Sequence, residues 1–282
     1  MQGESATMVR DAEGKRLMLT VPGKKFEQLQ RFLLARSEHA IAFLKVSIRK
    51  IAIAWLMIFG CLAILRVVMS PTPADTFVQQ LQLVMPYILV AASPFAGYFV
   101  GRAAITGKRA RQASSINLNP FGQWKKLSPS QALKHSNYGP IGFLASLIIG
   151  MILNVVFRSG EFLLAIPALS LEAPEWGYTL FWLATFDTAI MNFFYMVCFV
   201  MALRTIPLFP KMLLYTWLLD VSLQLSIAKI MAQMATPAEV ASTLVSLLNG
   251  NIDKVLLSAA IWLPYMMLSE RVNVTFRHRV AG

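Results

Sequence analysis

The chain has 282 residues, of which 56% are hydrophobic and 14% charged, and its formal net charge is +12. The apolar share exceeds the roughly 45–50% of soluble globular domains and is concentrated in long runs, which argues against one soluble core and indicates membrane spans. All but four of the 26 lysines and arginines fall in four segments, before Ile51, in 101–139, in 204–211 and after Glu270. The positive-inside rule accounts for this distribution, so we expect no nucleic-acid partner.

The first 100 residues are predicted to form a tail and a membrane hairpin. Residues 1–50 are basic and end in an amphipathic pattern, typical either of a helix on the inner membrane face or of a solvated helix packed on a cytoplasmic loop. Residues 51–100 are predicted to form two spans, about Ile51–Met69 and Phe77–Val100, joined by a proline-rich turn. Small residues four apart on the second span predict close helix packing. They are Ser93, Gly97 and Gly101.

Residues 101–139 are predicted to form a basic cytoplasmic loop. The cluster Lys108, Arg109 and Arg111 is a candidate contact for anionic lipid headgroups. The alternative is that these charges only fix the topology of the neighbouring spans.

Residues 140–276 are predicted to form a four-helix transmembrane unit, followed by a cytoplasmic tail, 277–282. The third span, about Pro140–Phe157, carries a second stripe of small residues, Gly142, Ser146 and Gly150, predicted to pack against a helix. The fourth and fifth spans lie within 177–234, and the sixth is predicted at about Lys254–Ser269. The fold class is therefore an all-α polytopic membrane protein with six transmembrane helices and both termini cytoplasmic.

The fourth and fifth spans each carry one carboxylate near the middle, Asp187 and Asp220. Ionisable residues at that depth are costly and indicate a functional site by default. Three interpretations stay open: a proton or cation relay, a structural polar cluster, and an ion pair of one carboxylate with Lys229. The candidate residues of this group are Asp187, Thr188, Asn192, Asp220, Gln224 and Lys229.

The second half of the chain resembles a family of bacterial membrane proteins. The segments that carry the likeness are YGPIGFLASLIIG (138–150), RTIPLFPKMLLYTW (204–217) and IWLPYMMLSERVNVTF (261–276). They resemble the domain-of-unknown-function family 2569, the YdgK-like integral membrane proteins, over about residues 136–278. The resemblance implies a four-helix membrane unit, to which this chain adds two spans, and brings no established activity.

The sequence carries no recognisable catalytic motif, and we expect neither a cofactor nor a metal site. Our first hypothesis is an accessory or scaffold subunit of a membrane complex in the bacterial inner membrane, with the lipid bilayer and other membrane subunits as partners. The alternative is a small secondary transporter or lipid-handling permease that uses Asp187 and Asp220.

Overall fold

The computed structural model describes residues 7–10, 16–19, 23–72, 74–103 and 124–282. In these ranges the chain forms eight helices and four strands. Their bounds are β1 Thr7–Arg10, β2 Arg16–Leu19, α1 Gly23–Val68, α2 Phe77–Ala103, β3 Trp124–Lys126, α3 Pro129–Lys134, α4 Phe143–Ala165, α5 Glu175–Leu203, α6 Phe209–Ala232, α7 Ala238–Leu268, α8 Glu270–Arg277 and β4 Arg279–Ala281. Six of the helices, α1, α2 and α4–α7, are long and apolar enough to cross a bilayer, which confirms the predicted all-α polytopic membrane fold.

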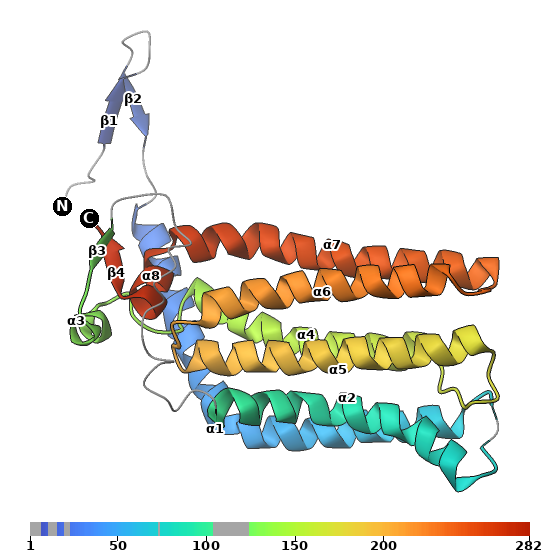
Figure 1. Ribbon diagram of the computed structural model, residues 1–282. Coiled ribbons are helices and arrows are strands. Elements are labelled where there is room, and N and C mark those ends of the chain that lie inside the picture. The colour runs from blue at the N-terminus through green and yellow to red at the C-terminus, as the bar shows by residue number, and fades with distance from the viewer. Residues whose placement is uncertain (1–6, 11–15, 20–22, 73, 104–123) are drawn as a thin grey trace.

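The membrane helices lie side by side along one axis (Figure 1). Helix α5 occupies the middle of the bundle, since it packs on α2, α4 and α6, and α7 packs on α6. The start of α1, the C-terminus and the α5–α6 connector lie at one end of the bundle, together with α8 and β3–β4 (Figure 1). We call it the basic end, because the basic segments described in the structure gather there.

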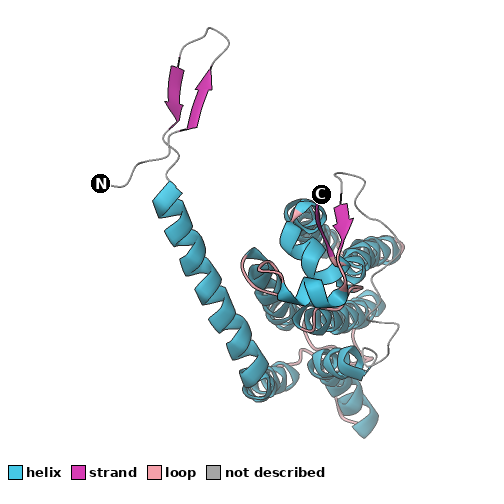
Figure 2. Ribbon diagram, turned by 90° about the vertical axis from the view of Figure 1, so that its left-hand side faces the viewer, coloured by secondary structure: helices cyan, strands magenta, loops and turns pink. Residues whose placement is uncertain are grey.

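Helix α1 is too long for a single straight crossing. Its 46 residues extend about 69 Å at 1.5 Å per residue, against a hydrocarbon core of about 30 Å. Figures 1 and 2 show that its first part runs across the basic end and its later part runs along α2. Ser37 holds the first part in place, because its Oγ accepts a hydrogen bond of 2.7 Å from the Gly142 amide at the start of α4. The structure therefore joins the predicted amphipathic helix and the first span into one helix.

The contact between α2 and α5 depends on small residues. A Cβ atom added to Gly97 would lie 2.3 Å from the carbonyl oxygen of Phe193, and one on Gly101 would lie 3.1 Å from Cβ of Val200. Ser93 is buried and donates to the carbonyl of Val90 at 3.0 Å. The Val90 carbonyl lacks its usual helical donor, because Pro94 has no N–H to donate to it. The stripe on α2 thus lies directly against the central helix.

The basic end is closed by the C-terminal segment. Asn273 donates to the carbonyls of Met267 and Ser269 at 3.1 and 2.9 Å, and its Oδ1 accepts from Arg277 and Arg279 at 2.8 and 2.9 Å. Beside it the Phe276 ring packs on Phe209 of α6, and β4 pairs with β3. The fully buried side chains of α8 therefore anchor the C-terminus to the bundle.

The last membrane helix differs from the prediction. The sixth span was expected to begin at Lys254, but α7 begins at Ala238, so Lys254 lies near the middle of the helix. Charged residues at positions 253 and 254 suggested the start of the span because a lone charge in hydrocarbon is costly. In the structure Lys254 pairs with Glu161 of α4, which offsets that cost.

Candidate functional site

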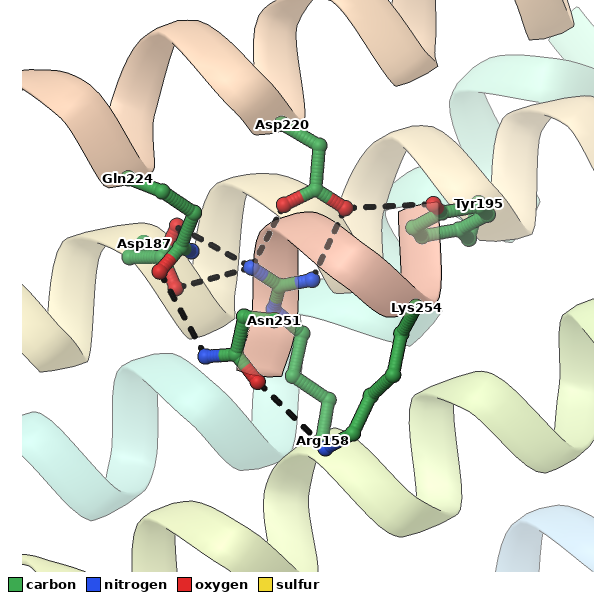
Figure 3. Close-up of polar contacts among 7 residues, drawn as sticks. All are labelled: Arg158, Asp187, Tyr195, Asp220, Gln224, Asn251 and Lys254. Atoms are coloured by element: carbon green, nitrogen blue, oxygen red, sulfur yellow. Dashed lines mark hydrogen bonds and ion pairs between the residues drawn. The ribbon is translucent and has the colours of Figure 1, made fainter. Parts of the chain in front are cut away.

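Arg158 lies between the two carboxylates of the fourth and fifth predicted spans. Its Nη2 donates to Asp187 Oδ2 at 2.9 Å and to Asp220 Oδ1 at 2.8 Å, and its Nη1 donates to Asp220 Oδ2 at 2.9 Å. The three side chains come from α4, α5 and α6 and converge at one point (Figure 3). The Arg158 side chain is 11% exposed, that of Asp187 10% and that of Asp220 0%. We call these three residues the arginine–carboxylate cluster.

Neutral side chains complete the cluster. The Tyr195 hydroxyl donates to Asp220 Oδ2 at 3.1 Å, and Gln224 Nε2 donates to Asp187 Oδ1 at 3.0 Å. Asn251 of α7 in turn donates to Gln224 Oε1 at 3.4 Å (Figure 3). Each oxygen of both carboxylates therefore accepts at least one hydrogen bond.

The helix order explains why the two carboxylates meet. Helices α5 and α6 are antiparallel neighbours, and Asp187 and Asp220 lie near the middle of their helices, so they reach the same depth. Arg158 reaches them because α4 continues to Ala165, about 10 Å beyond Arg158 at 1.5 Å per residue. The cluster therefore lies within the span, away from both ends of the bundle.

The cluster holds two carboxylates and one guanidinium. With all three ionised it carries one negative charge in excess, because Glu161 and Lys254 nearby balance each other. An excess charge in a low-dielectric interior is costly unless a proton or a cation neutralises it. One proton or one monovalent cation would neutralise the cluster.

A cavity of about 320 Å³ borders the cluster between α4, α6 and α7. Its lining mixes polar and aromatic side chains with apolar ones. The residues are Ser146, Leu147, Gly150, Met151, Asn154, Phe157, Arg158, Glu161, Tyr195, Leu213, Trp217, Asp220, Asn251, Lys254, Val255, Ser258 and Trp262. A volume of this size is in the range of small-molecule sites, roughly 300–1,000 Å³. The cluster therefore has direct access to a space that a small solute could fill.

Helices α4 and α7 face each other across this cavity and meet through side chains at two levels. The ammonium group of Lys254 pairs with Glu161, and the Phe143 ring stacks on Trp262 at 4.7 Å between centroids. These two contacts bridge α4 and α7 beside the cavity.

The predicted polar residues are only partly brought together. Asp187, Asp220 and Gln224 are in direct contact in the cluster, and Thr188 lines a smaller space beside it. Asn192 is fully buried, but its Nδ2 donates to Ser159 of α4 at 2.8 Å instead of to a carboxylate.

The ion pair of a carboxylate with Lys229, one of the three open interpretations, is not found among the described residues. Lys229 is exposed on α6, and the described ion pairs of both carboxylates are made by Arg158. Residue 158 was missed because an arginine after an apolar run suggested the end of the third span. The available signal was the apolar segment that follows it, Phe162–Ala165, which continues the helix.

The stripe on α4 has a different environment from the stripe on α2. Ser146 and Gly150 line the cavity, and a Cβ added to Gly150 would meet no atom within 4 Å. Gly142, with φ of 68°, precedes α4 and lies against Leu34 of α1. The predicted lipid contacts Lys108, Arg109 and Arg111 lie outside the described residues.

No group of three His, Cys, Asp or Glu side chains that could hold a metal occurs in the described part of the chain. Cys198 is buried beside the Thr216 hydroxyl at 3.4 Å, and Cys61 is exposed on α1.

Comparison with known proteins adds no relative. No family model, no curated protein and no solved structure matches the chain. Its function has to be inferred from the arginine–carboxylate cluster and the cavity themselves.

Proposed function

We propose that this protein is a small secondary transporter that couples solute movement to a proton or a monovalent cation. The observation that carries the proposal is the arginine–carboxylate cluster, buried in mid-bundle and open to a 320 Å³ cavity. Ionisable residues in membrane spans are retained at a cost, and they typically mark ion and substrate pathways. A purely apolar bundle of the same size would need none of them.

The coupling follows from the charge balance of the cluster. When one carboxylate takes up a proton or a cation, the excess negative charge disappears and the guanidinium of Arg158 is shared with a single anionic partner. Arg158 then has donors free for an acceptor group of a solute in the cavity. Loss of the proton restores both ion pairs and expels the acceptor. The neutral groups Tyr195 and Gln224 hold the carboxylates in position in both states.

We assign the protein to the bacterial inner membrane, and the resemblance to the YdgK-like family supports this location. The basic end would face the cytoplasm. The cavity then lies near the bilayer midplane, the usual depth of solute sites in secondary transporters.

The test is solute-driven current in reconstituted protein. Proteoliposomes on a solid-supported membrane are exposed to amino acids, organic carboxylates, amines and sugars under a pH gradient. We expect at least one class to evoke a current that Asp187→Asn/Asp220→Asn abolishes. Asp253→Asn is the matched control, because Asp253 is exposed on α7 and makes the same chemical change outside the cluster. If the double variant does not fold, Tyr195→Phe takes its place in the test, because it removes only the hydrogen bond from the Tyr195 hydroxyl to Asp220.

An accessory or scaffold subunit is the second candidate. It is favoured by the complete hydrogen bonding of both carboxylates, which is also what a structural polar cluster requires. In that case neither the wild type nor the double Asn variant would show a solute-driven current after purification. A stoichiometric partner would instead co-purify from native membranes in mild detergent.

A further inference from the structure

A second, apolar groove lies on the other side of the bundle from the polar cavity. It has a volume of about 350 Å³ and is formed by α1, α2 and α4 with one residue of α5. Its lining is almost entirely apolar. The residues are Ile48, Arg49, Ile51, Ala52, Trp55, Pro94, Phe95, Tyr98, Phe99, Arg102, Ile152, Val155, Val156 and Met196.

The charged residues of the groove lie at one mouth. Arg102 is the penultimate residue of α2, near the basic end. Trp55 of α1 bonds to Ala91 of α2, and the two helices run in opposite directions. Arg49, six residues before Trp55, therefore lies on the same side of this contact as Arg102. Both side chains are exposed, and neither makes an ion pair with the described residues. Arg204 donates to the carbonyl of Arg102 at 3.0 Å and brings a third guanidinium to this region. The mouth is therefore positively charged.

The interior of the groove offers little to a polar ligand, because the Tyr98 hydroxyl already accepts a hydrogen bond from Arg102 Nη1 at 3.5 Å. From Arg102 to Pro94 it extends about 12 Å along α2, at 1.5 Å per residue, into the hydrocarbon depth of the bundle. The indole N–H of Trp55 is already used, because it donates to the carbonyl of Ala91 at 3.2 Å. The groove is thus apolar along its length and cationic only at its mouth.

We infer that this groove binds a phospholipid with an anionic headgroup from the leaflet at the basic end. One acyl chain fills the groove, and the headgroup lies between Arg49 and Arg102. A transmembrane helix, 10–12 Å in diameter with its side chains, is too wide for a groove of this volume. Basic pockets between membrane helices on the cytoplasmic side are suited to anionic headgroups. The site is separate from the arginine–carboxylate cluster and does not depend on the proposed transport.

The first test measures headgroup selectivity. Purified full-length protein is titrated with phosphatidylglycerol or phosphatidylcholine, with native mass spectrometry and thermal unfolding as readouts. We expect phosphatidylglycerol to bind more tightly and to raise the melting temperature more. Arg49→Gln/Arg102→Gln should weaken its binding on the order of 20-fold, since each basic residue contributes about fivefold.

The matched control removes the same charge nearby. Lys45→Gln/Lys50→Gln changes two exposed residues of the same stretch of α1 that do not line the groove. We expect at most a few-fold loss. An equal loss in both double variants would mean general attraction to the membrane surface and would overturn the proposal.

The second test fills the groove without changing charge. Ala52→Phe places a ring in the groove, whereas Ala54→Phe, on an exposed position of the same helix, does not. Ala52→Phe should remove the stabilisation by phosphatidylglycerol, and Ala54→Phe should keep it, with both variants showing unchanged unfolding without lipid. If Ala52→Phe binds the lipid like the wild type, or if a second copy of the chain covers the groove in cross-linking, the proposal is wrong.

Discussion

Replacing Arg158 by methionine should destabilise the protein more than other single exchanges on its membrane helices. The change leaves Asp187 and Asp220 buried side by side without their cation, each having lost its ion pair of 2.8–2.9 Å. Removing one partner of a buried ion pair costs about 3–5 kcal/mol. The total free energy of unfolding of a protein is about 5–15 kcal/mol, so this loss is a large fraction of it.

Unfolding by denaturant in mild detergent measures this effect. Lys229→Met is the matched control, because Lys229 is an exposed cation on α6, and its loss should change stability by less than about 0.5 kcal/mol. The triple variant Arg158→Met/Asp187→Asn/Asp220→Asn removes all three charges and should regain most of the loss. If Arg158→Met and Lys229→Met have the same free energy of unfolding, the ion pairs of the cluster do not stabilise the fold as argued.

Three further predictions concern the packing and the basic end. Gly97→Leu should cost about 1–3 kcal/mol because its Cβ would lie 2.3 Å from the Phe193 carbonyl oxygen. Gly60→Leu is the control, because a Cβ added at Gly60 meets no atom within 4 Å, and equal denaturant midpoints for the two variants would refute the close contact. Asn273→Ala should lower stability by about 1–3 kcal/mol, since it removes the buried oxygen that accepts from both Arg277 and Arg279, and an unchanged midpoint would contradict this. Burial lowers the pKa of His278 below its ordinary 6.5, so the unfolded chain binds more protons and stability should fall as the pH drops below about 6.5. His278→Asn, which tolerates the left-handed φ of 49°, should flatten that pH dependence, and a slope that persists in the variant would assign it to other groups.

The number of membrane spans and the depth of the two carboxylates could be predicted from the sequence, but several span ends could not. Inside a bilayer every backbone N–H and C=O must find a hydrogen-bond partner within the protein, so a long apolar run that crosses it forms a helix. Six such runs therefore predicted six helices. Asp187 and Asp220 were identifiable because a charge in such a run is costly wherever its partner lies.

The partners of the carboxylates could not be predicted from the sequence. A local pattern cannot show that a helix continues past a charge, because the compensating charge comes from another helix. Arg158 suggested a span end and Lys254 a span start, yet each lies inside a helix opposite an acidic residue. The cavity between α4 and α7 likewise depends on tertiary contacts that spacing along one helix does not report.

Charge movement after a pH jump tests the central claim most directly, because it needs no knowledge of the solute. Proteoliposomes on a solid-supported membrane are stepped from neutral to acidic pH without added solute, and the transient current is recorded. We predict a transient current in the wild type and in Asp253→Asn that is absent in a folded Asp187→Asn/Asp220→Asn protein. A wild type without any current, or a double variant with the wild-type current, would contradict exchange of positive charge at the arginine–carboxylate cluster.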